Sequence, residues 1–361
     1  MKVAGFTIIK NAVVNDFPIL EAIRSILPVV DEMIVLIGDS TDETIALIES
    51  IGDPKIRIHH SIWNKELRKG GIVLADETNK AFQLIDASFD WAFYIQGDEV
   101  VHEKYHPAIR AACEKYKDDL PVQGLLFKYK HFYSTYDYVG DSRKWYAHEI
   151  RIIRNDKTIR SYRDAQGFRI GKNKLNVATI DASIYHYGWV KSPEQMRKKQ
   201  KETAMFWNDD TQLEKIKASP DYYDFSGYDS LERFTGTHPN VMKDRIEKKN
   251  WVIDIDVSKK KFSFKDTIYN LTFGKRDLLT IIGPPAIVKD IRRNPSKIDL
   301  YASCNSMYLP IKPIFTVAFG FFNFSKNTFH LFKSGSLNFV IFNLSSTIKS
   351  NFSSNIFKGT S

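Results

Sequence analysis

Residues 90–103 read DWAFYIQGDEVVHE, and this stretch decides the fold. Its apolar and aromatic run, Trp91–Ile95, has the length and composition of a buried strand. Two adjacent carboxylates, Asp98 and Glu99, end the run. We expect one strand over Asp90–Glu99 with both carboxylates at its carboxyl end, where open α/β sheets bind their ligands. An ordinary acidic turn is the alternative, and the rest of the N-terminal half argues against it.

Strands and helices are expected to alternate through the first hundred residues. Short apolar runs predict strands, and apolar residues at helical spacing predict helices. The expected strands span Val3–Ile9, Met33–Ile37, Ile56–His60 and Asp90–Glu99, and the expected helices span Phe17–Leu27, Thr44–Ile51 and Gly70–Ile85. This order predicts an α/β fold with a doubly wound, mostly parallel sheet.

The chain continues with strands and helices of less regular order. The expected elements are a helix, three strands and a basic helix, over Pro107–Lys117, Val122–Phe132, Trp145–Asn155, Ala182–Trp189 and Pro193–Trp207. The following stretch, to about Trp251, is rich in Asp, Lys, Tyr and Gly. We therefore expect a domain over residues 1–200 and a helical or irregular extension over residues 201–300.

Residues 301–361 differ in composition from the rest of the chain. They hold no Asp or Glu and 11 of the 25 Phe residues, and no helical or strand spacing persists in them. We expect this basic Phe-, Ser- and Asn-rich tail to be poorly ordered. A surface segment that lies on a membrane is the alternative. The apolar run Pro313–Phe324 is shorter than the roughly 18 residues that a membrane span needs.

Charge and cysteine content limit the cellular setting. The formal net charge of +9 favours anionic partners, which include nucleotide phosphates, nucleic acid and an acidic membrane face. The two cysteines, Cys113 and Cys304, are far apart and fit no metal-binding spacing, which indicates a reducing compartment. The N-terminus has only a very short apolar run, unlike a signal peptide. We expect a cytoplasmic protein, with the inner face of the membrane as a second location.

Polar residues follow three of the expected strands. Lys10 and Asn11 follow the first, the sequence GDSTDET (residues 38–44) follows the second, and QGDE (residues 96–99) follows the fourth. Such strand ends converge on one crevice in a doubly wound sheet. Lys69 and Gly70, ahead of a helix, add a cationic and backbone site suited to phosphates. The set suits a nucleotide diphosphate held through a divalent metal.

At this point the chain resembles the family 2 glycosyltransferases with the GT-A fold, from about Val3 to Lys199. Three segments carry the resemblance: the family's first strand, its DDGSTDGT segment and its acidic LDADE motif are similar to FTIIKN (residues 6–11), IGDSTDET (37–44) and IQGDE (95–99). The chain departs from the family where Ile37 and Gly38 replace an Asp pair and where Gln96 replaces the first Asp of the acidic motif.

The resemblance implies a metal-dependent transfer of sugar, with inversion, to a hydroxyl of a glycan or lipid-linked acceptor. Its donor would be a nucleotide-diphospho-sugar, and its metal Mg or Mn; no nucleic-acid partner is expected. The donor-binding residues implied are Thr7, Lys10, Asn11, Asp39, Lys69, Gly70 and Asp98, and the metal ligands implied are Asp98, Glu99 and His186. Asp164 is the first candidate base and Glu149 the second.

Each of these assignments has a plainer alternative. His186 lies among tyrosines, where a packed or hydrogen-bonded histidine is common, and Asp164 lies between Arg163 and Arg169, which suit an ion pair. A nucleotidyltransferase shares the fold, although the first loop, KNAVVND, lacks the glycine-rich basic sequence expected of one. A non-catalytic glycan-binding relative is a further alternative, which the Gln96 replacement leaves open.

Overall fold

The computed structural model describes residues 1–67, 69–142, 144–228, 230–253, 255 and 257, together with two strands near the C-terminus. The chain divides into two compact units, Met1–Lys260 and Lys261–Ser361. In the second unit, strands β14 (Leu331–Ser334) and β15 (Leu337–Val340) form an antiparallel pair. The remainder of the expected tail lies outside the described residues.

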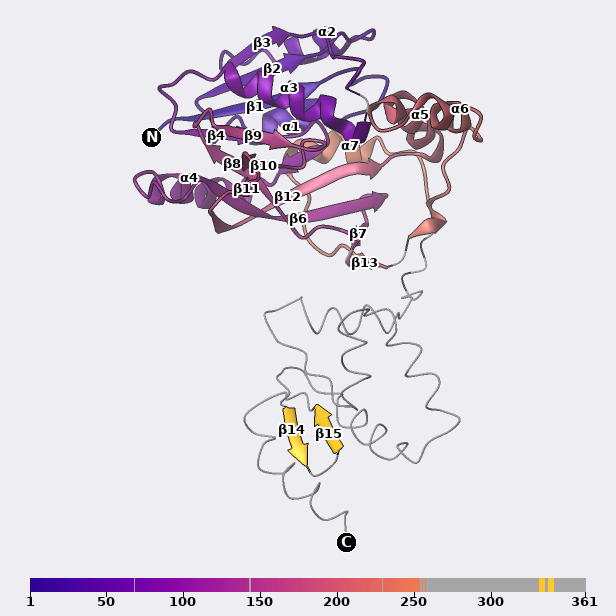
Figure 1. The fold of residues 1–361 in the computed structure, drawn as a ribbon. Helices are drawn as coiled ribbons and strands as arrows, with labels where there is room; N and C mark the ends of the chain where they lie inside the picture. The colour runs from indigo at the N-terminus through magenta and orange to yellow at the C-terminus, as the bar shows by residue number, and fades with distance from the viewer. Residues whose placement is uncertain are drawn as a thin grey trace. The chain divides into compact units, whose positions relative to one another are not determined.

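Four parallel strands form the N-terminal half of the sheet (Figure 1). They are β1 (Val3–Ile9), β2 (Glu32–Ile37), β3 (Ile56–His60) and β4 (Trp91–Tyr94), in the order β3-β2-β1-β4. Helices α1 (Ile19–Ile26), α2 (Thr44–Glu49) and α3 (Ile72–Gln83) connect them. The predicted alternation of strands and helices is confirmed, and so is the doubly wound α/β class.

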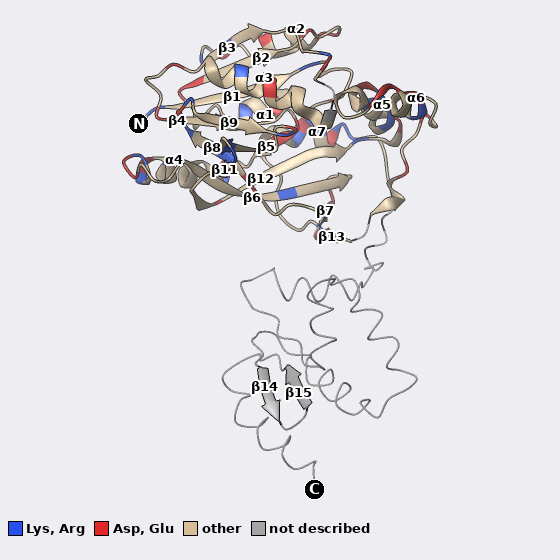
Figure 2. Ribbon diagram, viewed as in Figure 1, with Lys and Arg blue, Asp and Glu red and all other residues tan. Residues whose placement is uncertain are grey.

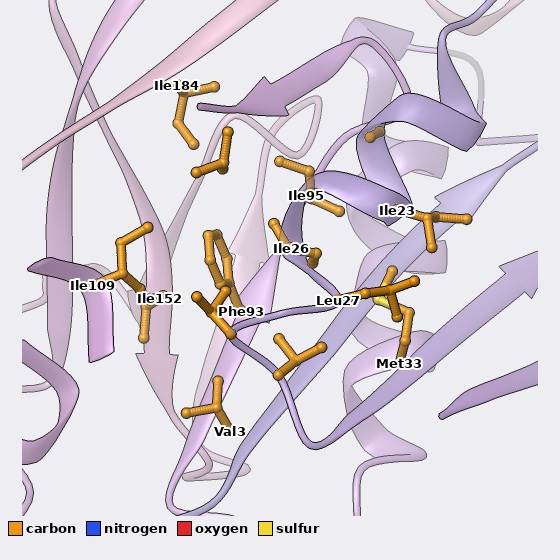
Figure 3. Close-up of a cluster of buried hydrophobic side chains, with 14 of the residues drawn as sticks. Val3, Ile23, Ile26, Leu27, Met33, Phe93, Ile95, Ile109, Ile152 and Ile184 are labelled. Carbon is orange, nitrogen blue, oxygen red and sulfur yellow. The ribbon is translucent and has the colours of Figure 1, made fainter. Parts of the chain in front are cut away.

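Side-chain alternation along the strands builds a core on each face of this half-sheet. Odd-numbered residues of β1 and β2, such as Val3 and Met33, pack with α1 in one buried cluster, part of which Figure 3 shows. Even-numbered residues, such as Phe6 and Ile34, pack with Phe82 of α3 in the other. Burial of each such side chain contributes about 1.5–3 kcal/mol, so the two layers hold the strand ends in fixed positions.

The sheet continues past β4 with strands of mixed direction. Strand β8 (His148–Arg154) is antiparallel to β4, and β6 (Gly124–Ser134) is antiparallel to β8. The long strand β12 (Val177–Val190) runs parallel to β6 and pairs antiparallel with β5 (Glu99–Val101). This extension gives a ten-stranded sheet that stays open at β3.

The expectation of a single strand over Asp90–Glu99 is wrong. Strand β4 ends at Tyr94, and the N–H of Glu99 donates to the carbonyl of Gln96 at 3.0 Å, which closes a turn. Glu99 then begins β5, which pairs with β12 instead of continuing β4. Asp98 therefore lies in a turn between two strands, and its neighbour Glu99 lies inside the sheet.

Shorter elements complete the first unit. Helix α4 (His106–Lys115) and strands β7 (Tyr138–Gly140) and β13 (Leu231–Arg233) flank the extension, and β9 (Ile159–Tyr162), β10 (Gly167–Ile170) and β11 (Asn173–Lys174) form a separate small sheet. Helices α5 (Pro193–Thr203), α6 (Asp210–Lys217) and α7 (Lys243–Glu247) follow β12. The helix predicted to reach Trp207 ends at Thr203 and continues as a 3₁₀ turn over Ala204–Phe206.

The described residues after 200 pack against the first 200. Tyr187 and His238 share a 2.8 Å hydrogen bond, and Arg245 forms an ion pair with Asp16 at 2.6 Å. Strand β13 pairs with β7 of the main sheet. The domain boundary expected at residue 200 stays a prediction. Charged residues of both signs are distributed over this unit (Figure 2).

Candidate active site

Asp98 meets a histidine and a lysine at the carboxyl end of β4. Its Oδ2 atom lies 3.6 Å from Nε2 of His186 on β12 and 3.3 Å from Nζ of Lys199 on α5. Burial alone would raise the pKa of Asp98, but the charges of Lys199 and His186 outweigh it and hold that pKa far below its usual range. The carboxylate of Asp98 is therefore ionised at physiological pH.

Gly188 makes this close approach possible. A Cβ atom at that position would lie 2.4 Å from Oδ2 of Asp98 and 2.6 Å from Nε2 of His186. Any side chain there would fill the space in which the carboxylate and the imidazole face each other. The backbone of β12 thus leaves room for a small ion beside Asp98 and His186.

His131 fixes which nitrogen of His186 carries a proton. Nε2 of His131 lies 3.2 Å from the carbonyl oxygen of Tyr146, which can only accept, so Nε2 donates. Burial, with the nearby His186 as the second cause, lowers the pKa of His131 to about 3, which keeps its ring neutral. Nδ1 of His131 is then an acceptor, and Nδ1 of His186, 3.3 Å away, must be the donor. In neutral His186 the lone pair of Nε2 therefore points toward Asp98.

A cation that took the place of the proton on Nε2 of His186 would lie between two acceptor atoms that are 3.6 Å apart. A carboxylate oxygen and an imidazole nitrogen oriented from behind by another group are common metal ligands. Among the described residues, no three His, Cys, Asp or Glu side chains gather into a complete metal site. The pair suits Mg or Mn bound mainly by ligand phosphates and water, as is usual for sites with few protein ligands.

Glu99 is held by a different partner. Its carboxylate forms a fully buried ion pair with Arg151, with Nη2 2.6 Å from Oε1 and Nε 2.8 Å from Oε2. The hydroxyl of Tyr129 and the N–H of Gln96 also donate to this carboxylate. Both oxygens of Glu99 are thus taken by protein donors, so this carboxylate has no free lone pair directed at the cation position beside Asp98.

Arg151 connects the turn after β4 to the loop between β9 and β10. Its guanidinium lies over the rings of Tyr94 and Tyr129, at 5.7 and 5.6 Å from their centroids. Besides Glu99, it donates to the carbonyl of Gln166 at 3.0 Å and lies 3.9 Å from Oε2 of Glu149. One buried cation thereby holds both strands β5 and β8 and the loop between β9 and β10.

Asp164 lies in that loop, in a tight backbone conformation. Its neighbours Arg163 and Ala165 have φ angles of 55° and 62°, in the left-handed region that L-residues seldom adopt. The loop is held over the end of β4 by Gln96, whose Nε2 donates to the carbonyl of Ala165 at 3.1 Å. It also packs on Gly71, where a Cβ atom would lie 2.6 Å from that of Asp164.

The ion pair that was the alternative for Asp164 is absent from the described part of the chain. The guanidinium groups of Arg163 and Arg169 lie over the ring of Tyr162 instead, at 4.9 and 4.4 Å from its centroid. Asp164 is half-buried and lies close enough to Glu149 to influence its titration. Among the described residues, therefore, no arginine forms an ion pair with the carboxylate that this loop presents.

Glu149 is the more buried of the two candidate bases. It is 9% exposed, and burial is the main cause that raises its pKa to about 7, against the opposing charge of Arg151. The charges of Glu99 and Asp164 raise this pKa further. A carboxylate with a pKa near neutrality can both hold and release a proton at physiological pH.

The loops after β1 and β2 are tied to each other. Nζ of Lys10 lies 2.7 Å from Asp39, and Oδ1 of Asn11 accepts from the N–H of Thr41 at 2.8 Å. Burial alone would raise the pKa of Asp39, but hydrogen bonds from Lys10 and from the N–H of Trp63 hold it below its ordinary value. The structure thus brings together the polar ends of two neighbouring strands, as predicted.

The other expected donor-binding residues, Thr7, Gly70 and Lys69, lie in three different environments. Thr7 is fully buried within β1, so its hydroxyl has no access to a ligand. Gly70 and Gly71 have φ angles of 66° and 72° in the turn before α3, a conformation that glycine adopts without strain. The side chain of Lys69 lies outside the described part of the chain.

Lys199, His131 and Arg151 are the site residues that sequence reasoning missed. The register of β12 on β6 places His186 opposite His131, and no local pattern reveals a pairing across 55 residues. Lys199 reaches Asp98 across 101 residues. The predicted basic helix over Pro193–Trp207 contains Lys199, but that prediction does not identify Asp98 as its partner.

The fold is GT-A-like, with a parallel half that ends in the acidic turn and an extension of mixed strands beyond it. No protein-family model matches the chain, and no curated protein does. Solved structures that are similar include TarS from S. aureus, at 18% identity and a TM-score of 0.34 over 60% of this chain and 42% of TarS. The chain thus spans less than half of that protein.

Two further similar structures are a glycosyltransferase and a nucleotidyltransferase. Glucosyl-3-phosphoglycerate synthase from Mycobacterium tuberculosis, solved with Mn²⁺, UDP and phosphoglyceric acid, has 22% identity and a TM-score of 0.25 over 37% of this chain and 43% of that chain. 4-Diphosphocytidyl-2C-methyl-D-erythritol synthase from Anaerococcus prevotii has 13% identity and a TM-score of 0.29, over 53% and 89%. At these values the likenesses assign no reaction, and the interpretation of the site rests on its own geometry.

Among the described residues, no helix has both the length and the apolar character needed to cross a bilayer.

Proposed function

We propose that this chain is a metal-assisted glycosyltransferase that moves a sugar from a nucleotide-diphospho-sugar to a hydroxyl of a glycan or lipid-linked acceptor, with inversion. One observation carries the proposal: the carboxylate of Asp98 and Nε2 of His186 face each other beside Gly188, at the carboxyl end of β4. An ionised carboxylate and an oriented imidazole at a strand end suit a cation that also binds a diphosphate.

Asp98 and His186 would hold Mg or Mn, which supplies charge to stabilise the departing diphosphate. His131 keeps the lone pair of His186 directed at that position. Lys199 adds a fixed positive charge beside Asp98, where it can meet a phosphate oxygen once Asp98 binds the metal. Because the carboxylate of Glu99 forms a buried ion pair with Arg151, we do not include Glu99 among the proposed metal ligands. We propose instead that Glu99 holds Arg151 in place.

Lys10, Asn11, Asp39 and Gly70 form the remainder of the proposed donor site. The ion pair of Lys10 with Asp39 and the hydrogen bond between Asn11 and Thr41 keep two strand-end loops in one arrangement. The turn at Gly70 presents backbone N–H groups ahead of α3, which suits an anion. We propose that Thr7 supports β1 from within the core and that its hydroxyl contacts no donor.

Asp164 is our candidate for the general base. It is free of Arg163 and Arg169, lies in a loop fixed by Gln96 and Gly71, and is more exposed than Glu149. A carboxylate in that position can accept the proton of an acceptor hydroxyl as the hydroxyl attacks the anomeric carbon. Glu149, with its pKa of about 7, is the second candidate and would receive or share that proton.

A donor screen tests the proposal. The protein is incubated with a panel of sugar nucleotides in Mn²⁺, in Mg²⁺ and in EDTA, and release of nucleoside diphosphate is measured. We expect release with a subset of donors in the presence of metal, and its loss in Asp98→Asn. Release of pyrophosphate from a nucleoside triphosphate instead would indicate a nucleotidyltransferase. Failure of every donor to bind, with or without metal, would contradict the proposal.

A further inference from the structure

A second groove lies on the opposite face of the extension from the candidate active site. The β6–β12 register pairs His131 with His186 and, one residue earlier, Lys130 with Tyr185. Successive side chains of a strand point to opposite faces, so Lys130 and Tyr185 lie on the face away from the two histidines. An open groove of about 290 Å³ on that face is lined by three basic residues, three aromatic residues and one acidic residue, Glu232, among others; the basic and aromatic residues are Lys104, Lys130, Arg233, Tyr105, Tyr185 and Phe234.

The floor of this groove is aromatic and fixed by packing. The ring of Phe234 packs edge-on against Tyr185 and Phe132, with centroids 6.0 and 4.9 Å apart. The ring of Tyr105 lies half-buried beside His102. Gly236 gives Phe234 its space, since a Cβ atom there would lie 2.7 Å from the ring. Rigid, partly exposed rings of this kind present flat apolar surface to a ligand.

The walls of the groove carry an excess of positive charge, with three basic side chains against the single carboxylate of Glu232. Lys104 and Lys130 place their ammonium groups 5.1 and 5.9 Å from the centroids of Tyr105 and Phe234, and Arg233 is exposed. Among the described residues, no carboxylate lies within ion-pair distance of these three cations. Lys128, two residues from Lys130 on the same strand, differs, because Asp181 neutralises it at 2.7 Å. Figure 2 shows β6 with its basic residues in blue.

The volume of the groove and the chemistry of its side chains together indicate the class of ligand. A volume of about 290 Å³ lies at the low end of small-ligand pockets and holds one or two sugar rings, whereas single-stranded nucleic-acid sites span about four or more nucleotides. Partly exposed rings suit the apolar face of a sugar, and unpaired cations suit phosphate or carboxylate groups. We propose that this groove binds an anionic sugar unit, one that carries a phosphate or a carboxylate. The site is separate from the donor site and does not depend on the proposed transferase activity.

Binding of three probes to the full chain tests this inference. Isothermal titration calorimetry is run with glucose 6-phosphate, with a glucuronate-containing disaccharide and with maltose. We expect one or both anionic probes to bind and maltose to bind at least about tenfold more weakly, since only the anionic probes gain charge-assisted hydrogen bonds from the basic side chains. The first two probes distinguish phosphate from carboxylate. Equal binding of maltose would overturn the inference.

Variants locate the binding. Lys130→Ala combined with Arg233→Ala should weaken the anionic probe about tenfold or more, whereas Lys128→Ala on the same strand should leave it unchanged. Phe234→Leu gives a second variant that retains an apolar core residue. Asp98→Asn should bind the probe as the wild type does, which separates this groove from the donor site. Unchanged affinity in the double variant, equal loss in Lys128→Ala, or tighter binding of a single-stranded oligonucleotide to the groove would each contradict the proposal.

Discussion

The proposed donor side and the proposed acceptor side of the candidate site are built in different ways. The donor side rests on strand ends of the parallel half, where short ties such as Lys10 to Asp39 and Asn11 to Thr41 join neighbouring loops. The acceptor side rests on one buried cation, Arg151, which joins Glu99, Gln166 and the vicinity of Glu149. The arrangement of the donor side can therefore be predicted from the order of the strands. The arrangement of the acceptor side depends on contacts between segments that are distant in the sequence.

The largest effect is expected from breaking the acceptor side alone. Asp164→Asn should lower the rate of transfer by about 10²–10⁴-fold, because it removes the base that accepts the acceptor proton. The affinity for donor should remain nearly unchanged, since Asp164 is assigned no contact with the donor. Steady-state kinetics with donor and acceptor varied separately, together with donor titration, measure the two effects. A variant that loses donor affinity to the same extent would place Asp164 on the donor side.

Removal of Arg151 should disturb both sides and the fold. Arg151→Met leaves the carboxylate of Glu99 buried without its partner, which we expect to cost about 3–5 kcal/mol in the free energy of unfolding. Arg57→Met is the matched control, because Arg57 is 55% exposed and lies 3.7 Å from Glu32. Its effect should be at most about 1 kcal/mol. Urea denaturation measures the free energy of unfolding of both variants. A similar loss of stability in the two variants would contradict the claim that the buried ion pair of Arg151 with Glu99 stabilises the fold.

Glu149, on the acceptor side, should make the stability of the fold depend on pH. Its pKa is about 7 in the folded chain and near 4.5 when unfolded, so the folded state binds the proton more tightly and loses stability as pH rises between these values. Glu149→Gln removes this loss, so its stability relative to the wild type should increase from pH 5 to pH 8, by up to about 3 kcal/mol. Thermal unfolding of both proteins across this range provides the measurement. A difference independent of pH would show that Glu149 is not buried in this way.

Strand order, helix positions and the α/β class followed from the sequence because they depend on residues close together along the chain. Val3–Ile9 and Ile56–His60 were predicted with the boundaries that the structure has. The turn after β4 was not predicted, because the run from Trp91 to Val101 is apolar on both sides of QGDE and only pairing with β12 divides it. The strand signal alone could not separate the roles of Asp98 and Glu99.

The partners of the site residues could not be read from the sequence for the same reason. His131 and His186 meet only through the β6–β12 register, and Lys199 reaches Asp98 from a helix that follows. The sequence did identify Asp98, His186, Asp164 and Glu149 as carriers of suitable chemistry. It could not show that Arg163 and Arg169 pack on Tyr162, which leaves Asp164 without the ion pair that its neighbours suggest.

Metal binding tests the central claim most directly. Mn²⁺ is titrated into the protein, with and without nucleoside diphosphates, and bound metal is followed by electron paramagnetic resonance in the wild type, Asp98→Asn, His186→Ala and the control Lys128→Ala. We predict that diphosphate promotes Mn²⁺ binding in the wild type and the control, and that both site variants lose it while their melting temperatures change little. Equal Mn²⁺ binding in all four proteins would contradict the assignment of Asp98 and His186 as the metal ligands.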